Sequence, residues 1–242
     1  MDRSGASDVD IQREYYRQTG HLYDDVHGGE QNPQHALALA FLTGALDWLS
    51  ASSVLDVGAG TGRVLRHLRG CRPELRLLGI EPVAELRQAG YASGLSEADL
   101  IEGDATDLPF PDGAFDLVSA FGMLHHVRRP ELIVAQMLRV ARVGIFISDA
   151  NYLGQGSRPV RWLKRGLTAL RLWRLADHVK TRGRGYTVSA GDGVSYSYSV
   201  FQSYAQIRSA CRDVYLLNTG SDQPNLYADA PSVALLGLKR PR

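Results

Sequence analysis

The feature that most constrains the fold is a short run of apolar residues that ends in a glycine-rich turn. The run covers residues 54–57, and the turn is Gly58-Ala59-Gly60-Thr61-Gly62. Glycine lets the backbone adopt conformations that other residues avoid, and lets it approach a ligand closely. A buried strand that enters such a turn and opens a helix, here from Arg63, is typical of the ligand-binding edge of an open α/β sheet.

Apolar segments alternate with helical patterns over residues 51–151, which predicts stacked βαβ units and a parallel sheet. The predicted strands cover 53–57, 75–80, 99–104, 115–120 and 144–148, and the predicted helices cover 33–50, 63–68, 83–90 and 131–140. Asn32-Pro33 is a favourable helix start, since Asn caps well and Pro suits the first turn.

The alternation stops at Asn151, and a different pattern follows. It predicts one long helix over 158–181, a hairpin of 186–188 with 194–200, and a helix over 200–211 that opens with a capping box at residues 199–202. The last two predicted strands, 214–217 and 233–238, are too close for a helical crossover, so we expect them to pair antiparallel.

Composition excludes several classes of protein. The chain of 242 residues has a net charge of +1 and 44% apolar residues, which argues against a uniformly basic nucleic-acid binder and against a disordered chain. Cys71 and Cys211 lack the spacing of a disulfide scaffold or a zinc module, so we expect no metal. The polar N-terminal residues and the lack of a long apolar window predict a cytoplasmic protein.

An acidic residue after the second predicted strand indicates a site that binds a ribose. Glu81 stands 25 residues after Asp56, where a carboxylate can accept from both ribose hydroxyls. A nicotinamide site would have the pattern GxGxxG, but here the third glycine comes one position early and Arg63 stands where the last should be. Asp56 would oppose a pyrophosphate, and it suits a cationic ligand.

Five motifs in order resemble those of the class I S-adenosylmethionine (SAM)-dependent methyltransferases. They are the segment 56–62, Glu81, Gly103-Asp104-Ala105, Phe115-Asp116-Leu117-Val118 and Leu124-His125-His126-Val127. The resemblance covers about residues 50–150 and extends to the final pair of strands. It implies a Rossmann-like sheet of seven strands, mostly parallel with an antiparallel last strand, with helices on both faces and a lid inserted after the fifth strand.

The resemblance also implies roles for single residues. Gly58 and Gly60 would pack beneath the methionine part of SAM, Asp56 would lie near its ammonium group, and Glu81 would bind the ribose hydroxyls. Asp104 would accept from the adenine amino group, and Ala105 would donate its backbone N–H. The full set of expected cofactor residues is Asp56, Gly58, Ala59, Gly60, Gly62, Glu81, Pro82, Asp104, Ala105, Phe121 and His125.

Candidate catalytic residues lie in two segments, and each has an ordinary structural interpretation. His125 and His126 follow the fourth predicted strand, where they could act as a base or form a hydrogen-bonded structural pair. Asp192 lies in the predicted hairpin turn. Tyr196 and Tyr198 would share one strand face, as a wall of the acceptor pocket or as two half-buried hairpin residues.

The segment 158–184 has nine basic residues and one acidic residue, a net charge of +8 on a chain whose remaining residues sum to −7. Apolar side chains fall on one side of the predicted helix and basic ones on the other. This pattern fits a lid helix packed on the core, a helix at a membrane surface, or an arginine-rich wall for an anionic acceptor; nucleic acid is a weaker alternative because no reader module is present.

These observations predict a single domain and a reaction class. We expect an N-terminal helical arm (1–50), a SAM-binding core (51–151), a lid insertion (152–198) and a C-terminal helix with a strand hairpin (199–242). The expected reaction is methyl transfer from SAM to a small, possibly anionic acceptor, with oxygen as the first choice. The alternatives are a peripheral-membrane enzyme with a lipid-linked or quinone-like acceptor, and a SAM-binding protein without methyl transfer. The sequence leaves the oligomeric state open.

Overall fold

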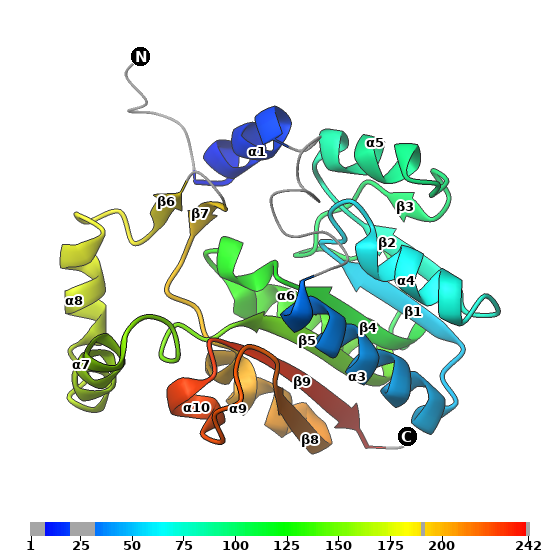
Figure 1. The fold of residues 1–242 in the computed structure, drawn as a ribbon. Coiled ribbons are helices and arrows are strands. Elements are labelled where there is room, and N and C mark those ends of the chain that lie inside the picture. Colours follow the sequence, from blue (N-terminus) through cyan, green and yellow to red (C-terminus); the bar gives the residue numbers. More distant parts are fainter. Residues whose placement is uncertain (1–7, 20–31, 190–191, 241–242) are drawn as a thin grey trace.

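The fold is built on one seven-stranded sheet, which a computed structural model describes for residues 8–19, 32–189 and 192–240 (Figure 1). The strand order is β3-β2-β1-β4-β5-β9-β8. The strands are β1 (Ser53–Val57), β2 (Arg76–Ile80), β3 (Leu100–Ile101), β4 (Phe115–Phe121), β5 (Ala141–Ala150), β8 (Cys211–Asn218) and β9 (Ser232–Lys239).

Strand directions follow the expected mixed pattern. The strands from β3 to β5 pair in parallel, with Asp56 opposite Gly79 of β2 and Ser119 of β4. The last strand, β9, lies between β5 and β8 and is antiparallel to both. Chain order reverses between β1 and β4, and the crevice beyond such a switch point is where open α/β sheets bind ligands.

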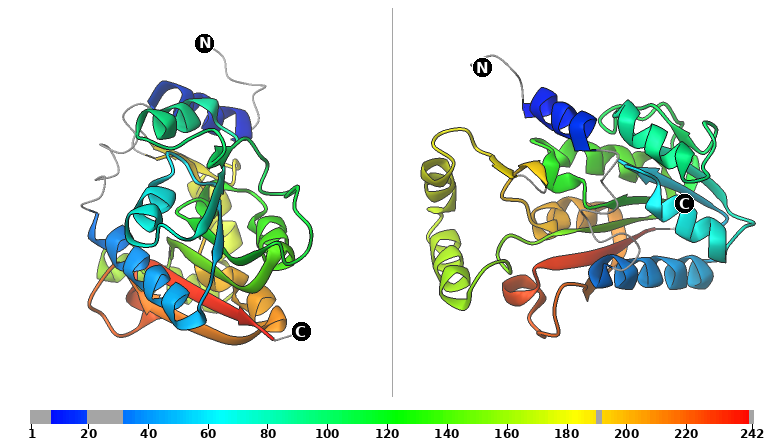
Figure 2. Two further views of the ribbon diagram at one scale, coloured as in Figure 1. Left: turned by 90° about the vertical axis from the view of Figure 1, so that its right-hand side faces the viewer. Right: turned by 45° about the horizontal axis from the view of Figure 1, so that its top comes forward.

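Helices cover both faces of the sheet (Figure 2). Helices α3 (Pro33–Leu49) and α4 (Arg63–Cys71) pack on one face through side chains that include Leu42 and Leu65. On the other face lie α6 (Pro130–Val140) and α9 (Val200–Ala210), which bury Met137 and Ile207. Helix α5 (Ala84–Ala92) lies beside α1 (Asp8–Thr19), and the short α10 (Leu226–Asp229) precedes β9.

Successive residues of a strand face opposite sides, so one strand supplies both cores. On β4, Leu117 belongs to the core under α3 and α4, whereas Val118 belongs to the core under α6 and α9. On β5, Phe146 and Ile147 divide in the same way. A strand buried on both faces needs apolar residues throughout, and this explains why the central segments lack polar alternation.

Two helix starts test the expected capping. The Asn32 side chain accepts from Gln34 N and His35 N at 3.1 and 3.3 Å, as predicted. Ser199 caps α9 by accepting from Phe201 N. A capping box also needs the Gln202 side chain to bond to the Ser199 backbone N–H. That part of the prediction is wrong, because the Gln202 amide donates to Ser197 O instead.

The insertion differs most from expectation. In place of one helix over 158–181, the chain forms α7 (Arg158–Ala169) and α8 (Trp173–Lys180). The break comes at Arg171, which has a left-handed φ of 60°. The hairpin of β6 (Thr187–Ser189) and β7 (Gly193–Ser195) is shorter than expected, so Tyr196 and Tyr198 lie beyond the strand. Residue 191 of the expected turn lies outside the described residues.

Helices α7 and α8 project from the body and bury none of their own residues (Figure 1). Of the interpretations of the basic helix, packing on the core through its apolar face is therefore wrong. Trp162 is 70% exposed and Val179 is 69% exposed. The helices are attached through Tyr152, which stacks on Trp173 at 4.8 Å between ring centroids. Within the part of the chain that the structure describes, no helix could span a membrane.

Candidate active site

The glycine-rich turn lies at the carboxyl end of β1 and is tied to the next strand. Gly58 and Gly60 have φ of 65° and 57°, a left-handed region that glycine adopts without strain. Ala59 N donates to Ile80 O at 2.9 Å, and Gly60 N donates to Glu81 Oε2 at 3.0 Å. The turn therefore holds its shape through bonds to β2 and to the carboxylate that follows β2.

Glu81 is buried at this edge of the sheet. Its second oxygen, Oε1, accepts from Val83 N at 2.9 Å, so each carboxylate oxygen has one backbone donor. A carboxylate oxygen can accept two hydrogen bonds, which leaves capacity for a ligand's hydroxyl groups. Burial raises the pKa of Glu81 to about 7, although the two backbone donors oppose the rise.

A cavity of about 390 Å³ opens between this turn and the loops after β3 and β4. Its volume is in the range of small-molecule sites. Of the expected cofactor residues, it is lined by Gly58, Gly60, Glu81, Pro82, Asp104, Ala105 and Phe121. Asp104 Oδ1 accepts from Thr106, and within the described residues neither Asp104 Oδ2 nor the Ala105 N–H has a hydrogen-bond partner.

Four other expected cofactor residues do not line this cavity: Asp56, Ala59, Gly62 and His125. Asp56 is 1% exposed and lies behind the site, where Ser119 Oγ donates to it at 2.6 Å. Burial raises the pKa of Asp56 to about 7, against the effect of Ser119. Gly62 has a packing role, because a Cβ there would collide with Leu95. Ala59 contributes through its backbone N–H.

A second cavity, of about 350 Å³, adjoins the first. The two share Phe121 and Gly122, at the carboxyl end of β4. The second cavity is lined mainly by polar groups, which include Arg63, His125, Asp149, Asp192 and Tyr196. His125 was expected at the cofactor, and it lines only this second cavity, whereas His126 lines the first.

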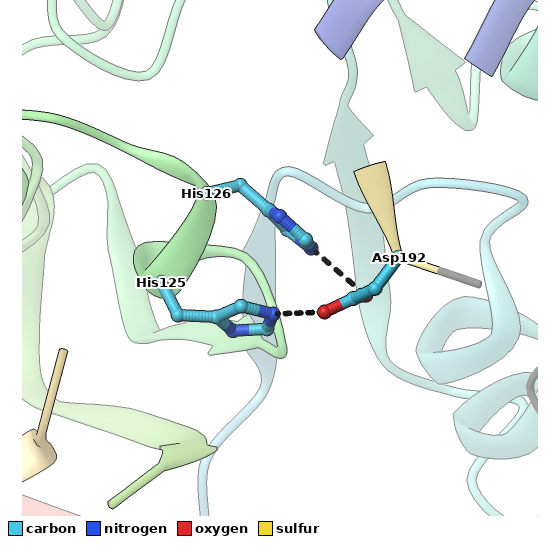
Figure 3. A group of neighbouring side chains, drawn as sticks. All are labelled: His125, His126 and Asp192. Atoms are coloured by element: carbon cyan, nitrogen blue, oxygen red, sulfur yellow. Dashed lines mark hydrogen bonds and ion pairs between the residues drawn. The ribbon is translucent and has the colours of Figure 1, made fainter. Parts of the chain in front are cut away.

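His125 lies between two carboxylates. It lies in the short helix η3 (Leu124–His126), and its Nδ1 is 2.7 Å from Asp149 Oδ1. Its Nε2 is 3.3 Å from Asp192 Oδ2 (Figure 3). Asp149 also accepts from Leu124 N at 2.8 Å, which fixes it beneath the histidine. Burial opposes a charged ring, but Asp149 and Asp192 outweigh it and raise the pKa of His125 to about 10.

His126 is fixed by the hairpin and by α1. Its Nδ1 lies 2.6 Å from Val194 O, and its Nε2 lies 3.4 Å from Asp192 Oδ1. Gln12 joins these parts, because its amide oxygen accepts from Val194 N and its amide nitrogen donates to Asp192 O. Tyr196 lines the second cavity, and its backbone N–H donates to His125 O at 2.8 Å.

Sequence reasoning missed Asp149 and Gln12. Asp149 follows the same rule as Asp56 and Glu81, since it stands near the carboxyl end of a parallel strand. That position was a signal that could have found it. Gln12 gave no signal, because its role depends on contacts with the hairpin, 180 residues away along the chain.

Comparison with known proteins finds a match in the central part of the chain. Residues 55–147 match the family described as "Methyltransferase domain". This match covers the glycine-rich turn, Glu81, Asp104 and the histidine pair. Over these residues the chain is similar to a methyltransferase domain, in line with the resemblance of its motifs to the class I SAM-dependent superfamily.

The relatives that the chain matches are named for different acceptors. It is 36% identical over 114 residues to ajmaline N-methyltransferase of Rauvolfia serpentina, covering 44% of this chain and 38% of the relative. It is 31% identical over 130 residues to phosphatidylethanolamine N-methyltransferase of Cereibacter sphaeroides, covering 47% and 57%. It is 32% identical over 100 residues to demethylmenaquinone methyltransferase of Roseiflexus sp., covering 41% and 42%. The chain thus matches about 40–60% of the length of these relatives.

Solved structures share the fold at low identity. A magnesium protoporphyrin IX methyltransferase from Synechocystis with bound S-adenosylhomocysteine (SAH) superposes with a TM-score of 0.59 at 15% identity, covering 97% of this chain and 100% of that one. A Haemonchus contortus phosphoethanolamine N-methyltransferase gives a TM-score of 0.63 at 14% identity, covering 99% and 61%.

The first cavity has groups that suit SAM. The cofactor presents a ribose diol, an adenine ring and a methionine part. Glu81 retains capacity to accept hydrogen bonds, and Asp104 Oδ2 and the Ala105 N–H are available for a base edge. At Gly58 a Cβ would lie 2.8 Å from Met123 Cε, so the turn needs glycine beside this side chain. The donors and acceptors that line the cavity thus fit SAM.

Proposed function

We propose that this protein transfers a methyl group from SAM to an oxygen atom of a small acceptor bound in the second cavity. The supporting observation is that the two cavities meet at Phe121–Gly122, with the His125–Asp149 pair on the acceptor side. Bound SAM supplies a methyl group on a positively charged sulfur, and that group accepts attack by a nucleophile in line with the carbon–sulfur bond.

The first cavity is the proposed cofactor site. Glu81 accepts from the ribose hydroxyls, Asp104 and Ala105 meet the adenine edge, and Gly58 and Gly60 leave room for the methionine part. Asp56 acts from behind the site through its charge. These groups hold the cofactor so that its reactive end faces the shared wall at Phe121.

The second cavity is the proposed acceptor site, and its groups suit an oxygen nucleophile. Asp149 fixes the His125 ring, and Nε2 lies beside Asp192 on the lining of the cavity where an acceptor oxygen would bind. Arg63 adds a positive group on the same lining, which favours an acceptor with a carboxylate or phenolate. Alignment of the nucleophile with the methyl carbon then provides most of the rate enhancement.

The test uses SAM with a labelled methyl group and a panel of hydroxybenzoates, catechols and primary amines. We expect label in the hydroxylated compounds and an equal amount of SAH. Tyr204→Ala, at an exposed site on α9, is a matched control and should leave transfer unchanged. Transfer to amines alone would contradict the choice of oxygen. SAM binding without transfer to any compound would favour a protein that binds the cofactor only.

The exposed insertion favours a second candidate function, a peripheral-membrane methyltransferase. Trp162, Leu163 and Leu170 are each more than 60% exposed on a segment of strongly positive charge. Apolar side chains beside lysine and arginine are typical of helices that lie in an anionic membrane surface. Among the relatives are a phosphatidylethanolamine and a demethylmenaquinone methyltransferase.

Co-sedimentation with phosphatidylglycerol vesicles tests this candidate. We expect binding at low salt that weakens with added salt, and loss of binding in the double variant Arg171→Glu/Arg174→Glu. These two arginines are exposed, whereas Arg161 approaches Asp229 and is a poorer target. Trp48→Ser is the matched apolar control, because Trp48 is 61% exposed on α3, outside the insertion. Wild-type protein that stays in the supernatant would eliminate the membrane candidate.

A further inference from the structure

Three metal-ligating side chains from distant segments converge between the two cavities. His125 and His126 come from η3, and Asp192 comes from the hairpin (Figure 3). One ligand atom of each lies within 4.8 Å of the other two. Asp192 Oδ2 is 3.3 Å from His125 Nε2, and Asp192 Oδ1 is 3.4 Å from His126 Nε2.

The Nδ1 atom of each histidine ring already has a hydrogen-bond acceptor. His126 Nδ1 lies 2.6 Å from the Val194 carbonyl oxygen, which can only accept, so Nδ1 carries a hydrogen. Gln12 Nε2 lies farther from the same nitrogen, at 3.3 Å. His125 Nδ1 lies 2.7 Å from the Asp149 carboxylate and donates in the same way. In neutral rings, both Nε2 atoms therefore present lone pairs.

Those lone pairs face the Asp192 carboxylate, which also has only lone pairs to offer. Something positive must lie between the three groups, either added protons or a metal ion. Imidazole rings that bind metals commonly donate their other N–H to a carboxylate or a backbone carbonyl, which is the arrangement seen at both histidines. Asp149 and Val194 would then fix the orientation of the ligand rings.

The spacing suits an ion of the first transition row. Ligand atoms at about 2.1 Å from a tetrahedral zinc ion stand about 3.4 Å apart. The distances from Asp192 to the two rings are 3.3 and 3.4 Å. Two histidines and one carboxylate leave at least one coordination position open, as in catalytic sites that bind a substrate oxygen.

We propose that His125, His126 and Asp192 bind one divalent transition-metal ion whose open position faces the acceptor cavity. The inference rests on the proposed function for its role, since such an ion would bind the acceptor oxygen and favour its ionised form. The sequence analysis named these three residues as catalytic candidates but expected no metal, because Asp192 stands 67 residues after His125. The hairpin of the insertion would then complete the site.

The test is a titration of tag-free, chelator-treated protein with Co²⁺, followed by visible absorption, and by equilibrium dialysis with Zn²⁺. We expect one ion per chain, cobalt absorption bands typical of nitrogen and oxygen ligands, and displacement of Co²⁺ by Zn²⁺. Asp192→Ala and His126→Gln should each weaken binding at least about 10-fold, the lower limit for loss of even an outer partner. His67→Gln is the matched control, because His67 is exposed on α4.

Two results would overturn the inference. One is a wild-type protein that binds neither ion, and the other is binding that the Asp192 and His126 variants retain in full. Circular dichroism of each variant shows whether it has folded. SAM titration and methyl transfer are measured on the same chelator-treated samples. Transfer at full rate without metal would contradict the proposed role of the ion and leave the proposed function standing. Metal binding without transfer would contradict the proposed function and leave the metal site standing.

Discussion

At the scale of single residues, the proposed SAM binding depends on carboxylates at the ends of parallel strands. Glu81→Ala should weaken SAM binding about 10- to 100-fold, because hydrogen bonds to a charged group contribute about 1.5–3 kcal/mol. Asp56→Ala should weaken it less, since Asp56 lies behind the cavity and acts through its charge. Calorimetric titration of folded variants measures both. Equal affinity in Glu81→Ala and wild type would mean that the ribose lies elsewhere.

The raised pKa of Glu81 predicts a dependence of SAM affinity on pH. The ribose hydroxyls donate to the ionised carboxylate, so a proton on Glu81 competes with the cofactor. Because burial raises this pKa to about 7, affinity should rise as the pH increases through about 7 and fall below it. Glu81→Gln should bind more weakly at high pH and lose the Glu81 part of this dependence. A wild-type affinity that is flat between about pH 6 and 8 would contradict the prediction.

Asp149 positions His125, and its removal should affect turnover more than cofactor binding. Asp149→Asn loses the charge beside Nδ1 and places an amide donor near Leu124 N. We expect kcat to fall about 100-fold, which is typical when a group that supports acid–base catalysis is lost. SAM affinity should change little. A parallel fall in SAM affinity would indicate general damage to the site.

The residue-level site was partly predictable. The turn glycines, Glu81, Asp104 and Ala105 lie at one cavity because each belongs to a motif read along a single strand end. The position of Asp56 behind the cavity could not be read from its motif, since it depends on Ser119 in the neighbouring strand. Gln12 was unpredictable for the same reason, because its partners come from the far side of the sequence.

At the scale of elements, the junction between sheet and insertion is held by Asn151. Its buried amide nitrogen lies within hydrogen-bond distance of three backbone carbonyls at 226, 227 and 230, and its oxygen accepts from Ser199 Oγ and Leu153 N. Asn151→Ala should lower the free energy of unfolding by about 2–3 kcal/mol, because buried backbone groups lose their partner. Urea denaturation measures the change.

A matched control for this variant is Asn218→Ala at the end of β8. The Asn218 side chain bonds to Ser221 and Gln223 in an exposed turn, so water can replace it. We expect a loss of less than about 1 kcal/mol there. Equal losses at the two sites would show that Asn151 does not hold the junction.

The broken helix shows why one element was mispredicted. Arg171 adopts a left-handed conformation, and Leu172 N and Arg171 N donate to Leu167 O and Thr168 O, which ends α7. This is the hydrogen-bond pattern of a Schellman ending, which sequence usually signals with glycine. Here an arginine takes the position, and the apolar periodicity continues into α8, so the pattern contained no stop signal.

At the scale of the whole molecule, the candidate site is assembled from the N-terminal helix, the core and the insertion. The core of residues 51–151 supplies the sheet edge, while α1 and the insertion's hairpin close over it through Gln12, Asp192 and Val194. We propose that the arm, core, insertion and C-terminal hairpin work as one domain. The core was predictable because its motifs are local, whereas the closure depends on contacts that periodicity does not encode.

The most direct test of the central claim is calorimetric titration of the purified protein with SAM, SAH and NADH. We expect that SAM and SAH both bind at one site per chain and that NADH gives no heat of binding. Binding of NADH without either sulfur compound would contradict the account, because the glycine-rich turn and Glu81 would then serve a dinucleotide.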